Sequence, residues 1–61
     1  MRERFVMWLK VGNTVRHRDE PELGEGRVVA TLPREKIALV MWDVGIQRRH
    51  IESALVRVIA K

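Results

Sequence analysis

Short stretches in which hydrophobic and polar residues alternate, separated by turn-forming residues, run along most of this chain. Alternation with period two and a high content of β-branched residues predict strands. The five predicted strands are residues 14–17, 26–32, 36–42, 46–50 and 56–59. Turns are expected at 33–35 and 43–45, and residues 52–54 predict a single 3-10 turn. Five short strands favour an all-β barrel or sandwich, and a barrel leaves no strand edge exposed.

The alternation also predicts which side chains face the core. In residues 26–32, Val28, Ala30 and Leu32 share one face. Residues 36–42 are apolar on both faces, so we expect a central strand that is covered on both sides. The predicted core comprises Val15, Val28, Ala30, Val40, Trp42, Ile46, Leu55 and Val58.

An apolar run from Phe5 to Leu9 precedes the predicted strands. We divide the chain into an N-terminal extension (1–10) and a barrel domain (11–61). The run is expected to cover the outer apolar face of residues 36–42, in its own chain or in a partner copy. Contact with a partner copy would make the protein a homo-oligomer. It is too short for a membrane span or a signal-peptide core. We therefore expect a cytoplasmic protein that does not associate with membranes.

Basic residues exceed acidic ones, with a formal net charge of +4. Arginine binds phosphate with planar, bidentate geometry, and a small basic domain can contact a nucleic-acid backbone. Candidate nucleic-acid-binding residues are Arg16, Arg18, Arg48, Arg49 and Lys36. The alternative is that alternation sends these side chains to different faces, where each solvates its own strand.

Acidic residues cluster between the first two predicted strands. Asp19, Glu20, Glu22 and Glu25 surround Pro21 and Gly24 and predict an ordered loop. Loops on a rigid scaffold carry many protein contacts, so these four acids are candidate protein-binding residues. The alternative is an exposed loop that pairs with neighbouring arginines of the same chain.

Candidate catalytic chemistry is sparse. The chain has no cysteine and no phosphate-binding glycine motif, and Ser53 has no recognisable base partner. His17 and His50 lack the short spacing typical of a metal pair. Three aromatic residues are too few for a methyl-lysine cage once Trp42 is assigned to the core. We expect a non-catalytic protein without a metal or cofactor.

Several of these residues form a pattern seen in known barrels. They are Gly12, Val15, Arg16, His17, Gly24, Gly26, Val28, Val29, Val40, Trp42, Asp43, Gly45, Leu55 and Val58. The pattern resembles small bacterial SH3-like or Tudor-like barrels. It is similar to the C-terminal Tudor-like domain of UvrD/PcrA-type helicases and to the barrels of the CarD/Mfd group and of KOW type.

The resemblance implies a five-stranded SH3-like barrel, here with an apolar N-terminal extension. Such barrels bind RNA polymerase, nucleic acid, ribosomal parts or peptides, so fold alone does not select a partner. The acidic loop departs from the pattern. The leading hypothesis is a small binding module in transcription or repair that contacts nucleic acid through its arginines. The alternative is a protein–protein adaptor that docks through the acidic loop and exposed apolar faces.

Overall fold

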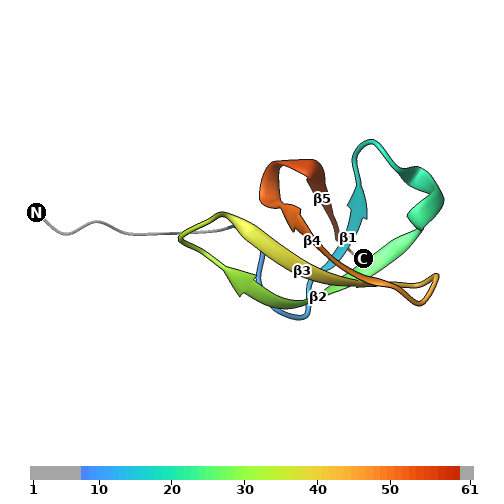
Figure 1. Ribbon diagram of the computed structural model, residues 1–61. Coiled ribbons are helices and arrows are strands. Elements are labelled where there is room, and N and C mark those ends of the chain that lie inside the picture. Colours follow the sequence, from blue (N-terminus) through green and yellow to red (C-terminus); the bar gives the residue numbers. More distant parts are fainter. Residues whose placement is uncertain (1–7, 60–61) are drawn as a thin grey trace, which may run out of the picture.

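The computed structural model of this chain describes residues 8–59. They contain five strands and two 3-10 turns (Figure 1). In chain order the elements are β1 (Thr14–His17), η1 (Pro21–Leu23), β2 (Glu25–Leu32), β3 (Ile37–Trp42), β4 (Gln47–Ile51), η2 (Glu52–Ala54) and β5 (Leu55–Val58). The all-β class and all five predicted strands are confirmed, with strand ends shifted by no more than one residue.

The strands form one antiparallel sheet in the order β4-β3-β2-β1-β5. Within residues 8–59, no hydrogen-bonded ladder joins β4 to β5, so hydrogen bonds do not close the sheet. The sheet nevertheless curls strongly. Although β2 and β3 separate β1 from β4, the ring centroids of His17 on β1 and His50 on β4 lie only 4.9 Å apart. This curled sheet is compatible with a small β-barrel.

Both predicted turns that flank β3 are present. Gly45 has a φ of 96°, and its N–H donates to the Trp42 carbonyl over 2.8 Å, as expected for a hairpin with glycine in the left-handed region. At the other end, the turn includes Lys36, whose φ of 59° also lies in the left-handed region. For this reason β3 begins at Ile37, one residue later than predicted.

A β-bulge in β2 overturns part of the predicted alternation. Val28 pairs with Val40, but the next pair joins Ala30 to Leu39, so the register shifts at Val29. A one-residue shift exchanges the two faces of a strand. The prediction that Ala30 and Leu32 share the face of Val28 is therefore wrong, because both residues lie on the opposite face.

The core is formed by eight buried apolar side chains: Leu9, Val15, Leu23, Val28, Ala38, Val40, Trp42 and Leu55. Five of them had been predicted: Val15, Val28, Val40, Trp42 and Leu55. The prediction for Ile46 is wrong, since this residue precedes β4 and its side chain is exposed. Ala30 and Val58 are half-buried.

The chain before β1 contributes to this core through Leu9, which is 1% exposed. The backbone N–H groups of Trp8 and Leu9 donate to Oε2 of Glu52, over 2.7 and 3.1 Å. These bonds satisfy a carboxylate that would be costly to bury alone. The prediction that Leu9 covers the outer face of β3 is wrong. Phe5 and the rest of 1–7, with the predicted oligomer contact, lie outside the described residues.

Candidate functional site

The face of β2, β3 and β4 that points away from the core is largely apolar. Paired residues on neighbouring antiparallel strands share a face. Three rows of paired residues make up this surface, here called the outer face: Leu32–Ile37–Ile51, Ala30–Leu39–Arg49 and Arg27–Met41–Gln47. Ile51 is 58% exposed, Met41 42% and Leu32 38%. The prediction that β3 is covered on both sides is therefore wrong for residues 8–59.

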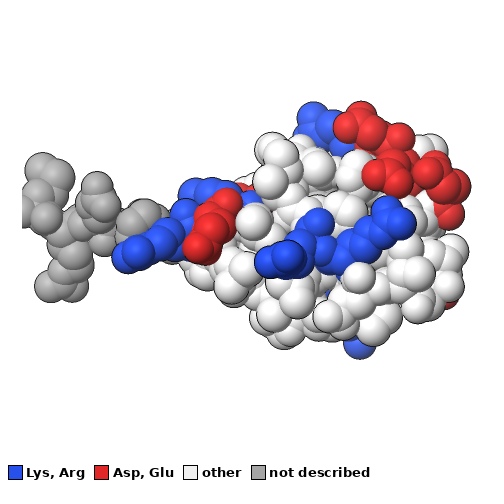
Figure 2. All heavy atoms as spheres, in the orientation of Figure 1, with Lys and Arg blue, Asp and Glu red and all other residues white. Residues whose placement is uncertain are grey.

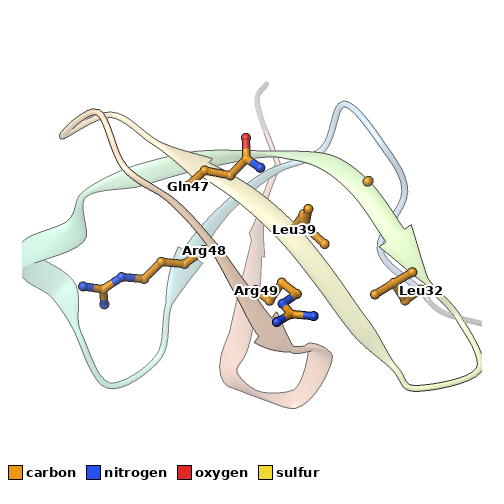
Figure 3. A pocket seen from close by; sticks show the side chains of 6 residues that line it. Leu32, Leu39, Gln47, Arg48 and Arg49 are labelled. Atoms are coloured by element: carbon orange, nitrogen blue, oxygen red, sulfur yellow. The ribbon is translucent and has the colours of Figure 1, made fainter.

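An open groove of about 530 Å³ lies in the outer face. Its lining residues come from three neighbouring strands: Ala30, Leu32, Leu39, Gln47, Arg48 and Arg49. Figure 3 shows Leu39 in the middle of the groove, between Gln47 on one side and Leu32 on the other, with Arg49 next to Leu39. The groove thus combines an apolar floor with amide and guanidinium groups, a mixture typical of binding sites.

The two arginines of β4 lie in different surroundings. Arg48 pairs with Val40 and extends away from the two leucines (Figure 3), so that its Nη1 lies 3.9 Å from Oε1 of Glu20. Arg49 pairs with Leu39 on the outer face. Within residues 8–59, the Arg49 side chain makes no hydrogen bond or ion pair. Arg49 therefore contributes a positive charge to the groove that no acidic side chain among residues 8–59 neutralises.

The other three candidate nucleic-acid-binding residues lie elsewhere in the fold. Arg16, on β1, approaches Glu25, with Nη2 and Oε2 separated by 3.9 Å. Arg18 follows β1, and its backbone N–H donates to the Ala54 carbonyl. Lys36 lies in the turn before β3. The five residues are thus spread over β1, the loop after it, the turn before β3 and β4, instead of forming one row.

The acidic loop gathers its charge at one end of the molecule. In Figure 2, acidic side chains cluster over the segment between β1 and β2, and basic side chains extend across β4 towards them. The internal pairing weighed for this loop is present at Glu20 and Glu25. Exposed ion pairs of this kind stabilise by about 0–1 kcal/mol. In the described part of the chain, Glu22 forms no ion pair.

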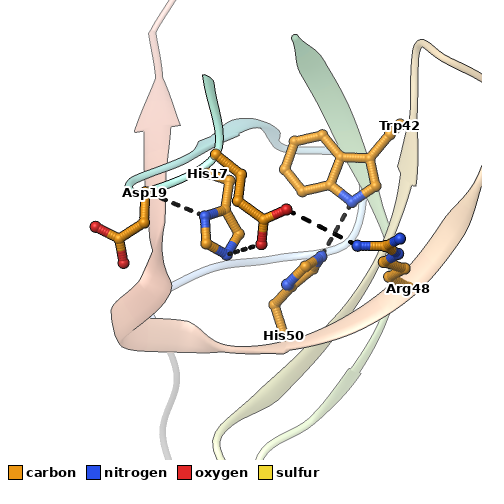
Figure 4. A network of polar contacts seen from close by, with 6 residues as sticks. His17, Asp19, Trp42, Arg48 and His50 are labelled. Atoms are coloured by element: carbon orange, nitrogen blue, oxygen red, sulfur yellow. Dashed lines mark hydrogen bonds and ion pairs between the residues drawn. The ribbon is translucent and has the colours of Figure 1, made fainter. Parts of the chain in front are cut away.

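Beneath the acidic loop, two histidines and Trp42 form a cluster (Figure 4). The Trp42 indole N–H donates to Nε2 of His50 over 3.1 Å. Because an indole can only donate, Nε2 must accept, and the neutral His50 ring carries its proton on Nδ1. Nδ1 of His17 accepts the Asp19 backbone N–H, and its Nε2 lies 3.8 Å from Oε2 of Glu20. The cluster therefore holds the acidic loop against β4.

Burial lowers the pKa of His50 below its ordinary value of 6.5, and the neighbouring His17 lowers it further. Glu20 acts in the opposite direction, and Arg48 adds a smaller lowering effect. In the unfolded chain His50 recovers its ordinary pKa, so the unfolded state binds a proton that the folded state resists. His50 therefore does not lower the free energy of unfolding above about pH 6.5. Below that pH the free energy of unfolding falls as the pH drops through the folded-state pKa of His50.

We accordingly expect the urea midpoint of the wild-type chain to decrease between pH 7.5 and the acid side of this window. In His50→Gln the group that titrates is gone, so the decrease over the same window should be smaller. Denaturation curves followed by circular dichroism at several pH values would measure both slopes. Equal slopes for the two proteins would show that His50 does not contribute to the pH dependence.

Sequence reasoning identified the charged residues but missed the groove. Alternation predicts Ala30, Leu32 and Leu39 in the core or on a covered face, and Gln47 is not among the predicted site residues. The signal that was available is the consecutive apolar run Val28-Val29-Ala30, which interrupts strict alternation. In residues 8–59, no group of three or more His, Asp or Glu side chains is arranged to hold a metal ion.

Comparison of the chain with known protein families, with characterised proteins and with solved structures finds no match. Among residues 8–59 no helix has the length and apolar character needed to cross a membrane.

Proposed function

We propose that this domain is a non-catalytic protein-binding module that docks a partner on its outer face. The observation that carries the proposal is the exposure of Leu32, Met41 and Ile51 on one surface, around an open groove. Contiguous apolar surface rimmed by polar groups is typical of protein interaction sites. The domain already has a separate buried core, so this second apolar surface is available for a partner.

The chemistry of the groove favours a protein over a nucleic acid. A phosphate backbone binds to a continuous track of positive charge. The groove instead has the uncharged side chains of Ala30, Leu32 and Leu39, which cannot donate a hydrogen bond to a phosphate. The three rows of the outer face contain no aromatic residue on which a base could stack. In addition, Glu25 and Glu20 partly neutralise Arg16 and Arg48.

Nucleic-acid binding in transcription or repair is the second candidate. Figure 2 favours it, because basic side chains extend along the visible face over β4. The proposed contacts are Arg16, Arg18, Arg48, Arg49 and Lys36. A nucleic-acid binder would bind labelled DNA or RNA at low salt, and its affinity would fall linearly with salt on logarithmic axes. Docking on an apolar surface would be much less sensitive to salt.

We also propose that the fold is an SH3-like barrel. The strand order β4-β3-β2-β1-β5 and the curling that brings His17 to His50 support this assignment. It agrees with the resemblance carried by the glycines, valines and Trp42. In such a fold the outer face of β2, β3 and β4 is a rigid platform, which lowers the entropic cost of binding a partner.

Affinity capture from lysate of the source cell, with and without nuclease treatment, tests the docking proposal. The baits are the wild type, Leu32→Glu in the groove, and Val44→Glu as a matched control. Val44 is a suitable control because its side chain is 59% exposed and therefore tolerates a charge. It lies in the β3–β4 turn and does not line the groove. We expect a specific protein to be retained by the wild type and the control, and Leu32→Glu to lose at least about tenfold in retention.

Two results would contradict the docking proposal. The first is retention that disappears with nuclease treatment, which would transfer support to the nucleic-acid candidate. The second is equal retention by all three baits, which would place the contact away from the outer face. Far-UV circular dichroism of each bait establishes that it is folded.

A further inference from the structure

We propose that the partner presents a carboxylate beside an apolar side chain, and that Arg49 binds the carboxylate while Leu32 and Leu39 receive the apolar group. This inference rests on the proposed function and names the chemistry of the segment that occupies the groove. It follows from the surroundings of Arg49, which differ from those of the other arginines on β1 and β4.

The positive charge of Arg49 limits which groups can occupy the groove. Glu25 accompanies Arg16 and Glu20 accompanies Arg48, whereas the Arg49 side chain has no partner in residues 8–59. A partner that covers the groove removes water from this guanidinium. Burying an unpaired charge is strongly unfavourable, and pairing it with a carboxylate relieves the penalty. The segment that docks in the groove is therefore expected to supply an acid.

The register of the outer face places Arg49 beside apolar side chains. Ala30, Leu39 and Arg49 occupy one row of paired residues, and Leu32 lies in the adjacent row. Side chains directly opposite each other on paired strands have Cβ atoms about 4.5–5.5 Å apart. A carboxylate on Arg49 therefore lies one side-chain spacing from an apolar group seated over Leu39. In an extended peptide, side chains two positions apart point to the same face.

The charge of Arg49 and the geometry of the rows define a motif: an aspartate or glutamate two positions from a large apolar residue, in an extended segment. Arginine favours this arrangement because its planar fork binds a carboxylate through two parallel hydrogen bonds. Gln47 lines the same groove and offers an amide to the backbone of the segment. A phosphate would satisfy Arg49 but would leave the leucines without an apolar contact.

Selection from a displayed library of random peptides, with the immobilised full chain as bait, tests this inference. We expect the enriched peptides to contain the acidic–apolar motif. For the best peptide, Arg49→Glu should raise the Kd by about tenfold or more. Arg57→Glu is the matched control, because Arg57 is exposed and lies on β5, at the opposite edge of the sheet. It changes net charge equally and should leave the Kd nearly unchanged.

A charge swap completes the experiment. Replacing the acid of the peptide with lysine should abolish binding to the wild type and restore it to Arg49→Glu. Because Arg49 is exposed, Arg49→Glu should keep the wild-type circular dichroism spectrum, and so should Arg49→Gln. Arg49→Gln provides a second variant that removes the charge without reversing it, and we expect an intermediate loss of affinity.

The outcomes separate this inference from the proposed function. Enrichment of apolar peptides without an acidic preference, lost with Leu32→Glu but unaffected by Arg49→Glu, would overturn the inference and support docking on the outer face. Peptides that bind Leu32→Glu as tightly as the wild type would overturn both. An oligonucleotide that binds the wild type and is lost with Arg49→Glu, in the absence of any enriched peptide, would favour the nucleic-acid candidate instead.

Discussion

Replacing Trp42 with alanine is expected to unfold the domain. The side chain is 1% exposed, packs among the strands of the core and donates its indole N–H to His50. Truncating a buried tryptophan costs about 3–5 kcal/mol, through lost burial and the cavity that remains. A core in a chain of this size rarely supplies more than about 3–5 kcal/mol of net stability. The loss therefore equals the whole stability of the native state.

Trp42→Phe separates the two contributions of the indole. Phenylalanine keeps an aromatic ring in the core but cannot donate to Nε2 of His50, so we expect a folded protein destabilised by about 1–2 kcal/mol. Far-UV circular dichroism with urea titration measures both variants. A Trp42→Ala protein with a wild-type urea midpoint would show that Trp42 is not the centre of the core.

Local pattern was sufficient to predict the strands and most of the core. Val15, Val40 and Trp42 follow simple alternation within β1 and β3, and Gly45 ends β3 with a turn that its backbone freedom permits. The bulge at Val29 could not be located from alternation, because it depends on how β2 pairs with β3. A single inserted position places Ala30 and Leu32 on the outer face instead of the face of Val28, where alternation predicts them, and both residues line the groove.

The candidate site shows the same limit at longer range. The sequence identifies Glu20 and Arg48 as charged residues, but their proximity depends on the curvature that brings β4 towards the loop after β1. Likewise, Arg48 and Arg49 are neighbours in the chain, and the pleat of β4 sends their side chains to different faces. Composition suggests a basic surface. Only the strand register shows that Arg49, and not Arg48, lies beside Leu39 on the outer face.

Gly26→Ala is expected to cause the second large loss of stability. Gly26 pairs with Trp42 across β2 and β3. A Cβ at this position would lie 2.5 Å from Cγ1 of Val40 and 2.6 Å from Cε3 of Trp42. Both neighbours are fully buried and have no room to move, so the added methyl overpacks the core. We expect a cost of about 1–3 kcal/mol, measured as a shift in the urea midpoint.

Adding Val40→Ala to Gly26→Ala tests whether close approach is the reason for glycine at this position. Val40→Ala alone destabilises by leaving a cavity, but in the double variant the new methyl occupies part of that space. We therefore expect the double variant to be more stable than the sum of the single losses predicts, with a coupling of about 1 kcal/mol. Gly45→Ala is the comparison, since an added Cβ there meets nothing within 4 Å and the cost arises from its φ of 96°. Its effect should add to that of Val40→Ala without coupling. Strict additivity at Gly26 as well would show that contact with Val40 is not what requires glycine in β2, and would leave the close approach of Trp42 as the reason.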